Sequence, residues 1–146
     1  MGARNRTRNQ VMKYTFKLPW HIVVGVKKQK RLPININWYR NAHHFTTSIV
    51  KRDFYPIGKI AKFHADKISV HYILVLNNNR NTDLMNWISV VDKFFMDWLV
   101  INNYIPDDNV RIVKHVEADS MISVKEPESY VIAEVETIGD RENDEL

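Results

Sequence analysis

Three acidic side chains flank the most apolar segment of this chain. Asp83 precedes that segment, and the neighbouring residues Asp107 and Asp108 follow it. Carboxylates that gather in a basic protein repel one another, and a bound divalent cation relieves the repulsion. The chain has no cysteine and its histidines show no ligand spacing, so oxygen ligands favour Mg²⁺ or Mn²⁺. We therefore expect Asp83, Asp107 and Asp108 to lie within reach of one shared ion.

Each acidic position also has an ordinary structural interpretation. Asp83, or Thr82 before it, is a good N-cap for the helix that is predicted to follow. The sequence from Pro106 to Asp108 is typical of a turn. At about 100° per residue, the predicted helix carries Asp83, Asn86 and Lys93 on one polar side, as a common amphipathic helix does. The sequence leaves both interpretations open.

Strand and helix patterns predict the elements that position these acids. Four segments have the β-branched and aromatic content or the alternation of strands: Tyr14–Leu18, Lys67–Asn77, Val110–Ala118 and Ser129–Glu136. Two segments are predicted to be helical, one within residues 42–63 and broken near Pro56, the other over 84–101. The order β-α-β-α-β-β predicts an α+β fold with helices packed on a mixed or mostly antiparallel sheet of about four strands.

Composition predicts one domain, residues 12–137. A disordered basic arm is expected over residues 1–11 and a disordered acidic tail over residues 138–146. No apolar run approaches the length of about 20 residues that a membrane span needs, so we expect no membrane partner. The lack of cysteine fits a reducing, cytoplasmic location.

The charges divide between the two halves of the sequence. Residues 1–64 hold 14 Lys and Arg against one acid, whereas residues 65–146 hold 7 against 16 acids. A polycation gains free energy when it replaces the counterions of phosphate chains, so we expect a nucleic-acid partner. The alternative, a basic arm that serves solubility, fits only the first few residues. We expect the following residues to contact phosphates: Lys17, Lys27, Lys28, Lys30, Arg31, Arg40, Lys51, Arg52, His43 and His44. Trp38 and Tyr39 are candidates to stack on an unpaired base, although we expect at least one of them to pack in the core.

Five short motifs resemble those of one known family. In chain order they read YTFKLPW, ININWYRNAHH, NTDLMN, DKFFMDWL and NYIPDDNV. Together they look like the successive motifs of the RusA family of Holliday-junction resolvases, many of them phage-encoded. The resemblance covers roughly residues 14–116, and its most specific part is the spacing of Lys93, Asp97 and the Asp107-Asp108 pair.

The resemblance implies a homodimeric endodeoxyribonuclease that depends on Mg²⁺ or Mn²⁺, in a bacterial host or a phage-infected cell. It would bind four-way or otherwise branched DNA and nick two strands symmetrically. Asp83, Asp107 and Asp108 would hold the metal, with Asn86 beside Asp83. Lys93 would stabilise the charge that develops on the phosphate, and the basic front half would hold the DNA arms.

The chain departs from the family at two places. Met85 stands where the family has an aspartate, and the spacing from Asn86 to Lys93 is longer by four residues, about one helical turn. Three functions remain open: a junction-resolving nuclease, a DNA-binding protein of the same fold without catalysis, and an interaction protein whose charged halves serve assembly. Only the nuclease requires the carboxylates.

Overall fold

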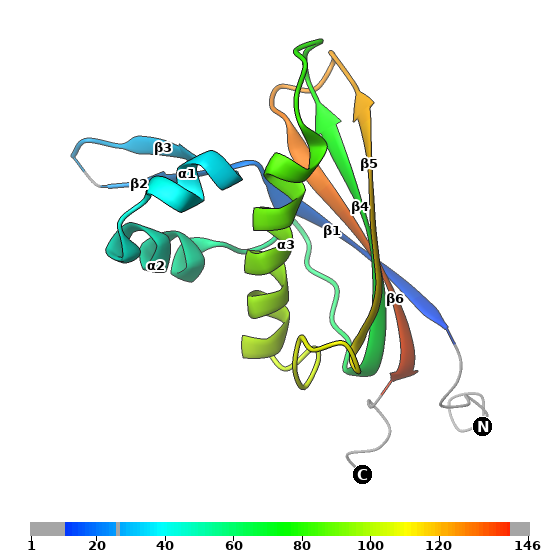
Figure 1. Ribbon diagram of the computed structural model, residues 1–146. Coiled ribbons are helices and arrows are strands. Elements are labelled where there is room, and N and C mark those ends of the chain that lie inside the picture. The colour runs from blue at the N-terminus through cyan, green and yellow to red at the C-terminus, as the bar shows by residue number, and fades with distance from the viewer. Residues whose placement is uncertain (1–10, 26, 141–146) are drawn as a thin grey trace.

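Strand β4, Ala65–Leu76, lies inside a four-stranded mixed sheet in the computed structural model, which describes residues 11–25 and 27–140 (Figure 1). The strand order is β1-β6-β4-β5, with β1 at Met12–Pro19, β6 at Tyr130–Asp140 and β5 at Val113–Ile122. β4 pairs antiparallel with β6 and parallel with β5, and β1 pairs antiparallel with β6. The predicted α+β class and four-stranded sheet are confirmed.

The core forms where helix α3, Leu84–Ile101, crosses one face of this sheet (Figure 1). Alternate residues of β4, among them Val70, Tyr72 and Leu74, are buried, as expected for a strand with one covered face. The ring of Phe95 in α3 lies 6.3 Å from that of Tyr72 and 5.2 Å from that of Phe16 in β1. Burial of each such aromatic side chain contributes roughly 1.5–3 kcal/mol. This packing fixes α3 on the sheet.

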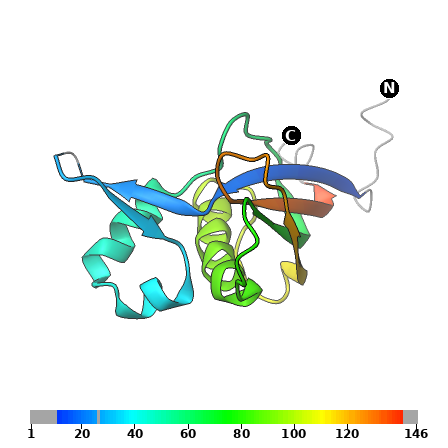
Figure 2. The same ribbon diagram turned by 90° about the horizontal axis from the view of Figure 1, so that it is seen from above.

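A second group of elements lies to one side of α3 (Figures 1 and 2). It consists of the antiparallel hairpin of β2, His21–Val24, and β3, Lys30–Pro33, followed by α1, Ile36–Asn41, and α2, His44–Asp53. We call residues 21–53 the basic lobe. The sequence did not predict the hairpin or α1, because each is short and its pattern is weak. The helix expected within residues 42–63 is α2, and no helix continues through residues 54–64.

Two predicted boundaries shift at the ends of strands. β5 begins at Val113 rather than Val110, because a turn precedes it in which the amides of Ile112 and Val113 donate to the carbonyl of Asn109. β6 continues to Asp140, so residues 138–140 of the expected tail belong to the sheet. Residues 1–10 of the expected arm and 141–146 of the tail lie outside the described residues. In the described part of the chain, no helix is long and apolar enough to cross a membrane.

On the uncovered face of the sheet, His71 of β4 joins three strands. Its Nε2 lies 2.7 Å from Asp119 of β5, and its Nδ1 lies 3.0 Å from Glu134 of β6. Both ring nitrogens can donate at once only when the imidazole is protonated. The hydrogen bond to Asp119 is the largest cause that raises the pKa of His71 above 6.5, and the bond to Glu134 adds to it.

The raised pKa of His71 predicts how stability depends on pH. Protonated His71 stabilises the fold below the unfolded-state pKa of about 6.5, and this contribution is lost as the pH rises through the raised folded-state value. In thermal unfolding, we expect His71→Gln to lower Tm by roughly 2–4 °C more at about pH 5.5 than at about pH 9. An equal deficit at both pH values would contradict a stabilising charge on His71.

Candidate functional site

Asp83 serves as the N-cap of α3. Its Oδ1 accepts a hydrogen bond of 3.1 Å from the amide of Met85, and its backbone is extended. The helix begins at Leu84, so the segment from Asp83 to Met85 is not a strand, in which these two side chains would point to the same side. Met85 is 52% exposed. An aspartate at position 85 would therefore not supply a second carboxylate beside Asp83.

Asn86 joins α3 to the basic lobe. Its Oδ1 accepts a hydrogen bond of 3.2 Å from the amide of Ile36, the first residue of α1. That amide is one of the helix-end donors without a partner inside the helix. The oxygen that the resemblance assigns to a metal thus already accepts from α1, which leaves one of its two lone pairs.

Asp107 and Asp108 lie beyond the other end of α3, which spans about 27 Å for its 18 residues. Asp107 is part of a turn, since its two carboxylate oxygens accept from the amide of Asp108 and from the side chain of Asn109. These bonds, the first above all, lower the pKa of Asp107.

The expected convergence of Asp83 with Asp107 and Asp108 is not found in the described chain. Among the described residues, no group of three or more His, Asp or Glu side chains is placed to hold a metal ion. The physical reason is the parallel pairing of β4 with β5. Asp83 follows the end of β4 and the doublet precedes the start of β5, so a crossover helix separates them.

Asp92, in the middle of α3, is the acidic residue that the sequence interpretation missed. The hydroxyl of Tyr72 donates a hydrogen bond to its Oδ1. Burial is the main cause that raises the pKa of Asp92, and the negative charge of Asp108 raises it further. We call Asp92 and Asp108 the acid pair. The sequence does contain a sign of this burial: Asp92 lies four residues after Ile88 and four before Met96, on the side of the helix that these buried residues occupy.

Lys93 points toward α1 rather than toward the acids. Its Nζ lies 5.8 Å from the centre of the Tyr39 ring. Tyr39 and Trp38 of α1 lie against Phe94 of α3, with ring centres 6.0 Å and 6.4 Å from it. Both aromatic candidates for stacking on a base therefore pack against the core, and Lys93 makes no ion pair within the described residues.

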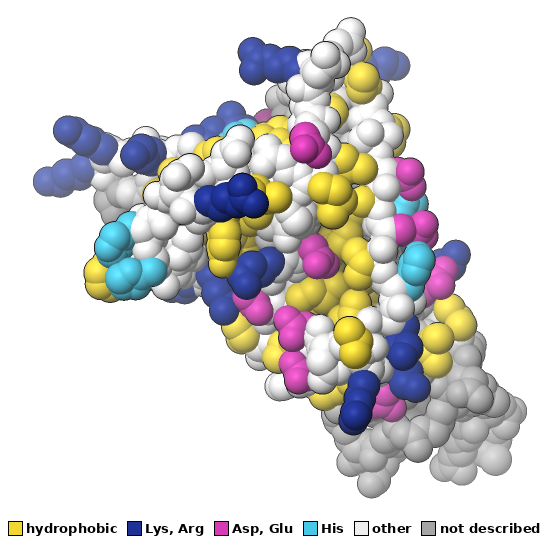
Figure 3. All heavy atoms as spheres, in the orientation of Figure 1, with side chains coloured by type: hydrophobic (Ala, Val, Ile, Leu, Met, Phe, Trp, Pro, Cys, Tyr) yellow, Lys and Arg dark blue, Asp and Glu magenta, His cyan; other side chains and the backbone are white. Residues whose placement is uncertain are grey.

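The basic residues divide into two groups. Lys27, Lys28 and Lys30 are exposed around the hairpin turn and Arg40 is exposed at the end of α1, and Figure 3 shows basic side chains spread over this lobe. The others have partners within the chain, which reduces their free charge. Arg31 pairs with Glu128, Lys51 with Asp97 and Arg52 with Asp53, at 2.8, 3.1 and 2.9 Å, and Lys17 lies over the Tyr130 ring.

His43 and His44 form an exposed ring cluster with Phe45 at the start of α2. Ring centres are 4.4 Å apart for the two histidines and 4.3 Å apart for His44 and Phe45. His43 also caps α2, because its Nδ1 accepts from the amide of Phe45 at 3.2 Å. Phe45 is 68% exposed. The histidines therefore lie on the basic lobe, as a phosphate contact requires.

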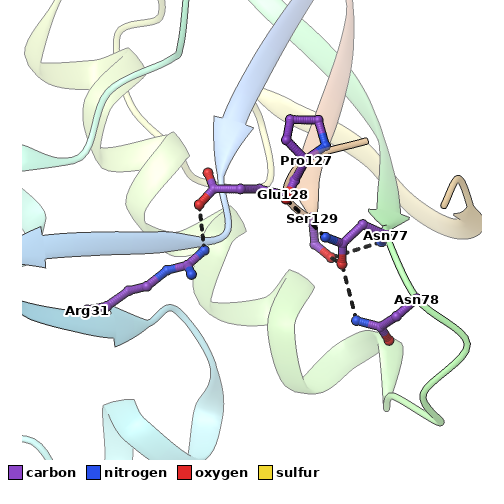
Figure 4. Close-up of polar contacts among 6 residues, drawn as sticks. All are labelled: Arg31, Asn77, Asn78, Pro127, Glu128 and Ser129. Carbon is purple, nitrogen blue, oxygen red and sulfur yellow. Dashed lines mark hydrogen bonds and ion pairs between the residues drawn. The ribbon is translucent and has the colours of Figure 1, made fainter. Parts of the chain in front are cut away.

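A polar cavity of about 580 Å³ opens at the N-terminal end of α3. Asp83 and Asn86 line it together with residues from the hairpin and from the loops after β4 and before β6. Figure 4 shows the contacts that hold its wall. Asn77 donates to the carbonyl of Pro127 and accepts from Ser129 and Asn78, while Arg31 pairs with Glu128.

His21 is the titratable residue of this cavity with the most unusual surroundings. Its Nδ1 is buried and has no hydrogen-bond partner. Burial, followed by the nearby charge of Arg31, lowers the pKa of His21 to about 4. His21 is therefore neutral at pH 7.

Comparisons with known proteins do not assign the chain to a family. No protein-family model matches it, and no significant match was found among curated proteins. The likeness to the RusA family thus rests on the five motifs, and its assignments of residues stay predictions.

Proposed function

We propose that this protein binds branched DNA through the basic lobe and hydrolyses it with a divalent metal ion at the acid pair. The separation of charge carries this proposal. Lys27, Lys28 and Lys30 form an exposed cationic hairpin, whereas Asp92 lies in α3 and Asp108 in the loop after it, both outside the lobe. Free ammonium groups attract the phosphate backbone without regard to base sequence.

Asp92 and Asp108 would offer a hard divalent cation two carboxylate groups. Two carboxylates supply oxygen ligands, and their mutual repulsion is part of the reason that the pKa of Asp92 is raised. Mg²⁺ in nucleotide-processing enzymes commonly binds one or two carboxylates and completes its shell with water and substrate phosphate. When bound, such an ion would make water nucleophilic near neutral pH and offset charge on the phosphate. Tyr72 holds Asp92 in place through its hydroxyl.

A second candidate function is DNA binding without catalysis. It is favoured by the roles of Asp83 and Asn86, whose oxygens accept from the amides of Met85 and Ile36. Under this alternative the polar residues of the RusA-like motif stabilise helix ends, and the basic lobe performs the function by itself.

A cleavage assay on a synthetic four-way junction separates these candidates. With Mg²⁺ or Mn²⁺, the natural protein should nick the junction, and EDTA should stop the reaction. Asp108→Asn should lower cleavage by at least about 100-fold, because a metal ligand is lost, yet keep or strengthen binding as a negative charge is removed.

Asp83→Asn is the matched control for this assay. Asparagine caps a helix about as well as aspartate does, so this variant should fold and cleave at close to the natural rate. Cleavage lost in Asp83→Asn but kept in Asp108→Asn would contradict the acid pair as the metal site. Tight binding with no cleavage by the natural protein would support the second candidate.

We also propose that the protein is a homodimer that pairs through β5. This strand is at the edge of the sheet, and Val116, Met121 and Ile122 are 44%, 51% and 54% exposed. A long edge strand with exposed apolar residues favours pairing with another strand. The charges of β5 are self-complementary: in an antiparallel pair centred on Val116, His115 would lie opposite Glu117 of the second copy.

Sedimentation velocity tests this dimer. Val116→Lys places two like charges opposite one another at the centre of the pair, so this variant should sediment as a monomer while the natural protein sediments as a dimer. Val23→Lys, a matched change at a 55% exposed valine of β2, should remain dimeric. A monomeric natural protein, or a dimeric Val116→Lys variant, would rule out pairing through β5.

A further inference from the structure

The proposed DNA binding and cleavage assign no function to the cavity at the N-terminal end of α3. Its volume of about 580 Å³ falls in the range of small-molecule sites. Asp83 at its edge lies nine residues before Asp92, so the cavity begins about 13 Å from the acid pair along the helix axis. It is a separate site from the acid pair.

Carboxamide side chains dominate the lining, and several of their polar groups are unused. Asn35 and Asn86 accept hydrogen bonds from helix amides through Oδ1, which leaves their amino groups for another partner. Asn81 is exposed and its side chain makes no hydrogen bond to the described residues. A carboxamide can donate and accept at once, as the polar edge of a nucleobase does.

His21 adds a buried polar atom without a partner. Its Nδ1 is excluded from solvent and accepts or donates no hydrogen bond within the described chain. Buried polar groups in folded proteins are nearly always paired, so the unpaired Nδ1 of His21 is an exception in the wall of the cavity. This observation is independent of the carboxamides.

Two stacked indoles form the aromatic part of the wall. The rings of Trp20 and Trp87 lie 3.4 Å apart between centres and are inclined by 14°. Trp87 is only 9% exposed and covers one face of Trp20, so Trp20 provides the aromatic surface on which a planar base could stack. The edge of the His21 ring contacts Trp87, with centres 5.7 Å apart, so the aromatic and polar parts adjoin.

The charges of the lining indicate an uncharged ligand. Arg31 forms an ion pair with Glu128 at 2.8 Å. The lining also holds one further positive charge, on Arg80, and one further negative charge, on Asp83. A cavity that bound a phosphate chain would carry an excess of cations. A polar, planar and neutral group is therefore a better match than a phosphate.

We propose that this cavity receives one unpaired nucleobase of branched DNA. The proposal rests on the proposed function, because it names what the protein would recognise in a branched substrate. At about 3.4 Å per stacked nucleotide, the distance of about 13 Å corresponds to roughly four nucleotides between the bound base and the acid pair. The cavity would thus set where the strand lies relative to the metal site.

Two DNA probes of equal length test the proposal: a duplex with one unpaired 2-aminopurine and the same duplex fully paired. The natural protein should bind the first at least about fivefold more tightly and quench 2-aminopurine fluorescence by stacking. Asn81→Ala should lose this preference while its affinity for the paired duplex is unchanged. Asn102→Ala, the same change at the opposite end of α3, should keep the preference.

A hairpin variant distinguishes failure of this proposal from failure of DNA binding itself. Replacement of Lys27, Lys28 and Lys30 by alanine should weaken binding of both probes by the same factor and retain their ratio. Equal affinity of the natural protein for the two probes would overturn the base site and leave the proposed function standing.

If neither of these probes nor the four-way junction binds, the proposed function fails, and the response to adenosine alone then tests the cavity. Adenosine that quenches tryptophan fluorescence in the natural protein, and does so less in Asn81→Ala, would support a nucleobase site. No quenching in the natural protein would overturn it.

Discussion

Helix α3 packs on β4 through Phe95 and Tyr72, and this contact determines where the polar groups of the protein lie. Tyr72 is fully buried by the helix, and its hydroxyl donates to Asp92, so the same residue holds the core and orients an acid. Different kinds of polar side chain lie at the two ends of this helix. Carboxamides and a neutral histidine lie at its N-terminal end, whereas the acidic turn follows its C-terminal end.

The basic lobe is joined to this frame by few polar contacts, each made at a helix end or a strand end. Asn86 of α3 accepts from the first amide of α1, and Lys51 of α2 pairs with Asp97 of α3. Arg31 of β3 pairs with Glu128, just before β6. These contacts neutralise part of the lobe and leave the hairpin lysines and Arg40 exposed.

Much of the fold follows from local patterns in the sequence. The β-branched and aromatic residues of 67–77 predicted a strand and the long apolar segment 84–101 predicted a helix, and β4 and α3 confirm both. The hairpin was missed because strands of four residues carry little periodicity. The expected convergence of Asp83 with Asp107 and Asp108 is not found among the described residues, because the sequence places the acids near strand ends but does not reveal at which end of the sheet each lies. Parallel pairing of β4 with β5 separates Asp83 from Asp107 and Asp108. Asp92 was missed because it looked like one more charge on a helix, and only its burial and its bond from Tyr72 distinguish it.

An NMR titration of the side-chain carboxyl carbon of Asp92 tests the acid pair most directly. We expect the pKa of Asp92 to lie above the ordinary value of 3.8, since burial and the charge of Asp108 both disfavour the carboxylate. Mg²⁺ should lower this pKa, because a bound cation favours the ionised form, and the effect should weaken in Asp108→Asn. A pKa of Asp92 that does not respond to Mg²⁺, together with Mg²⁺-dependent shifts at Asp83, would contradict the acid pair as the cation site.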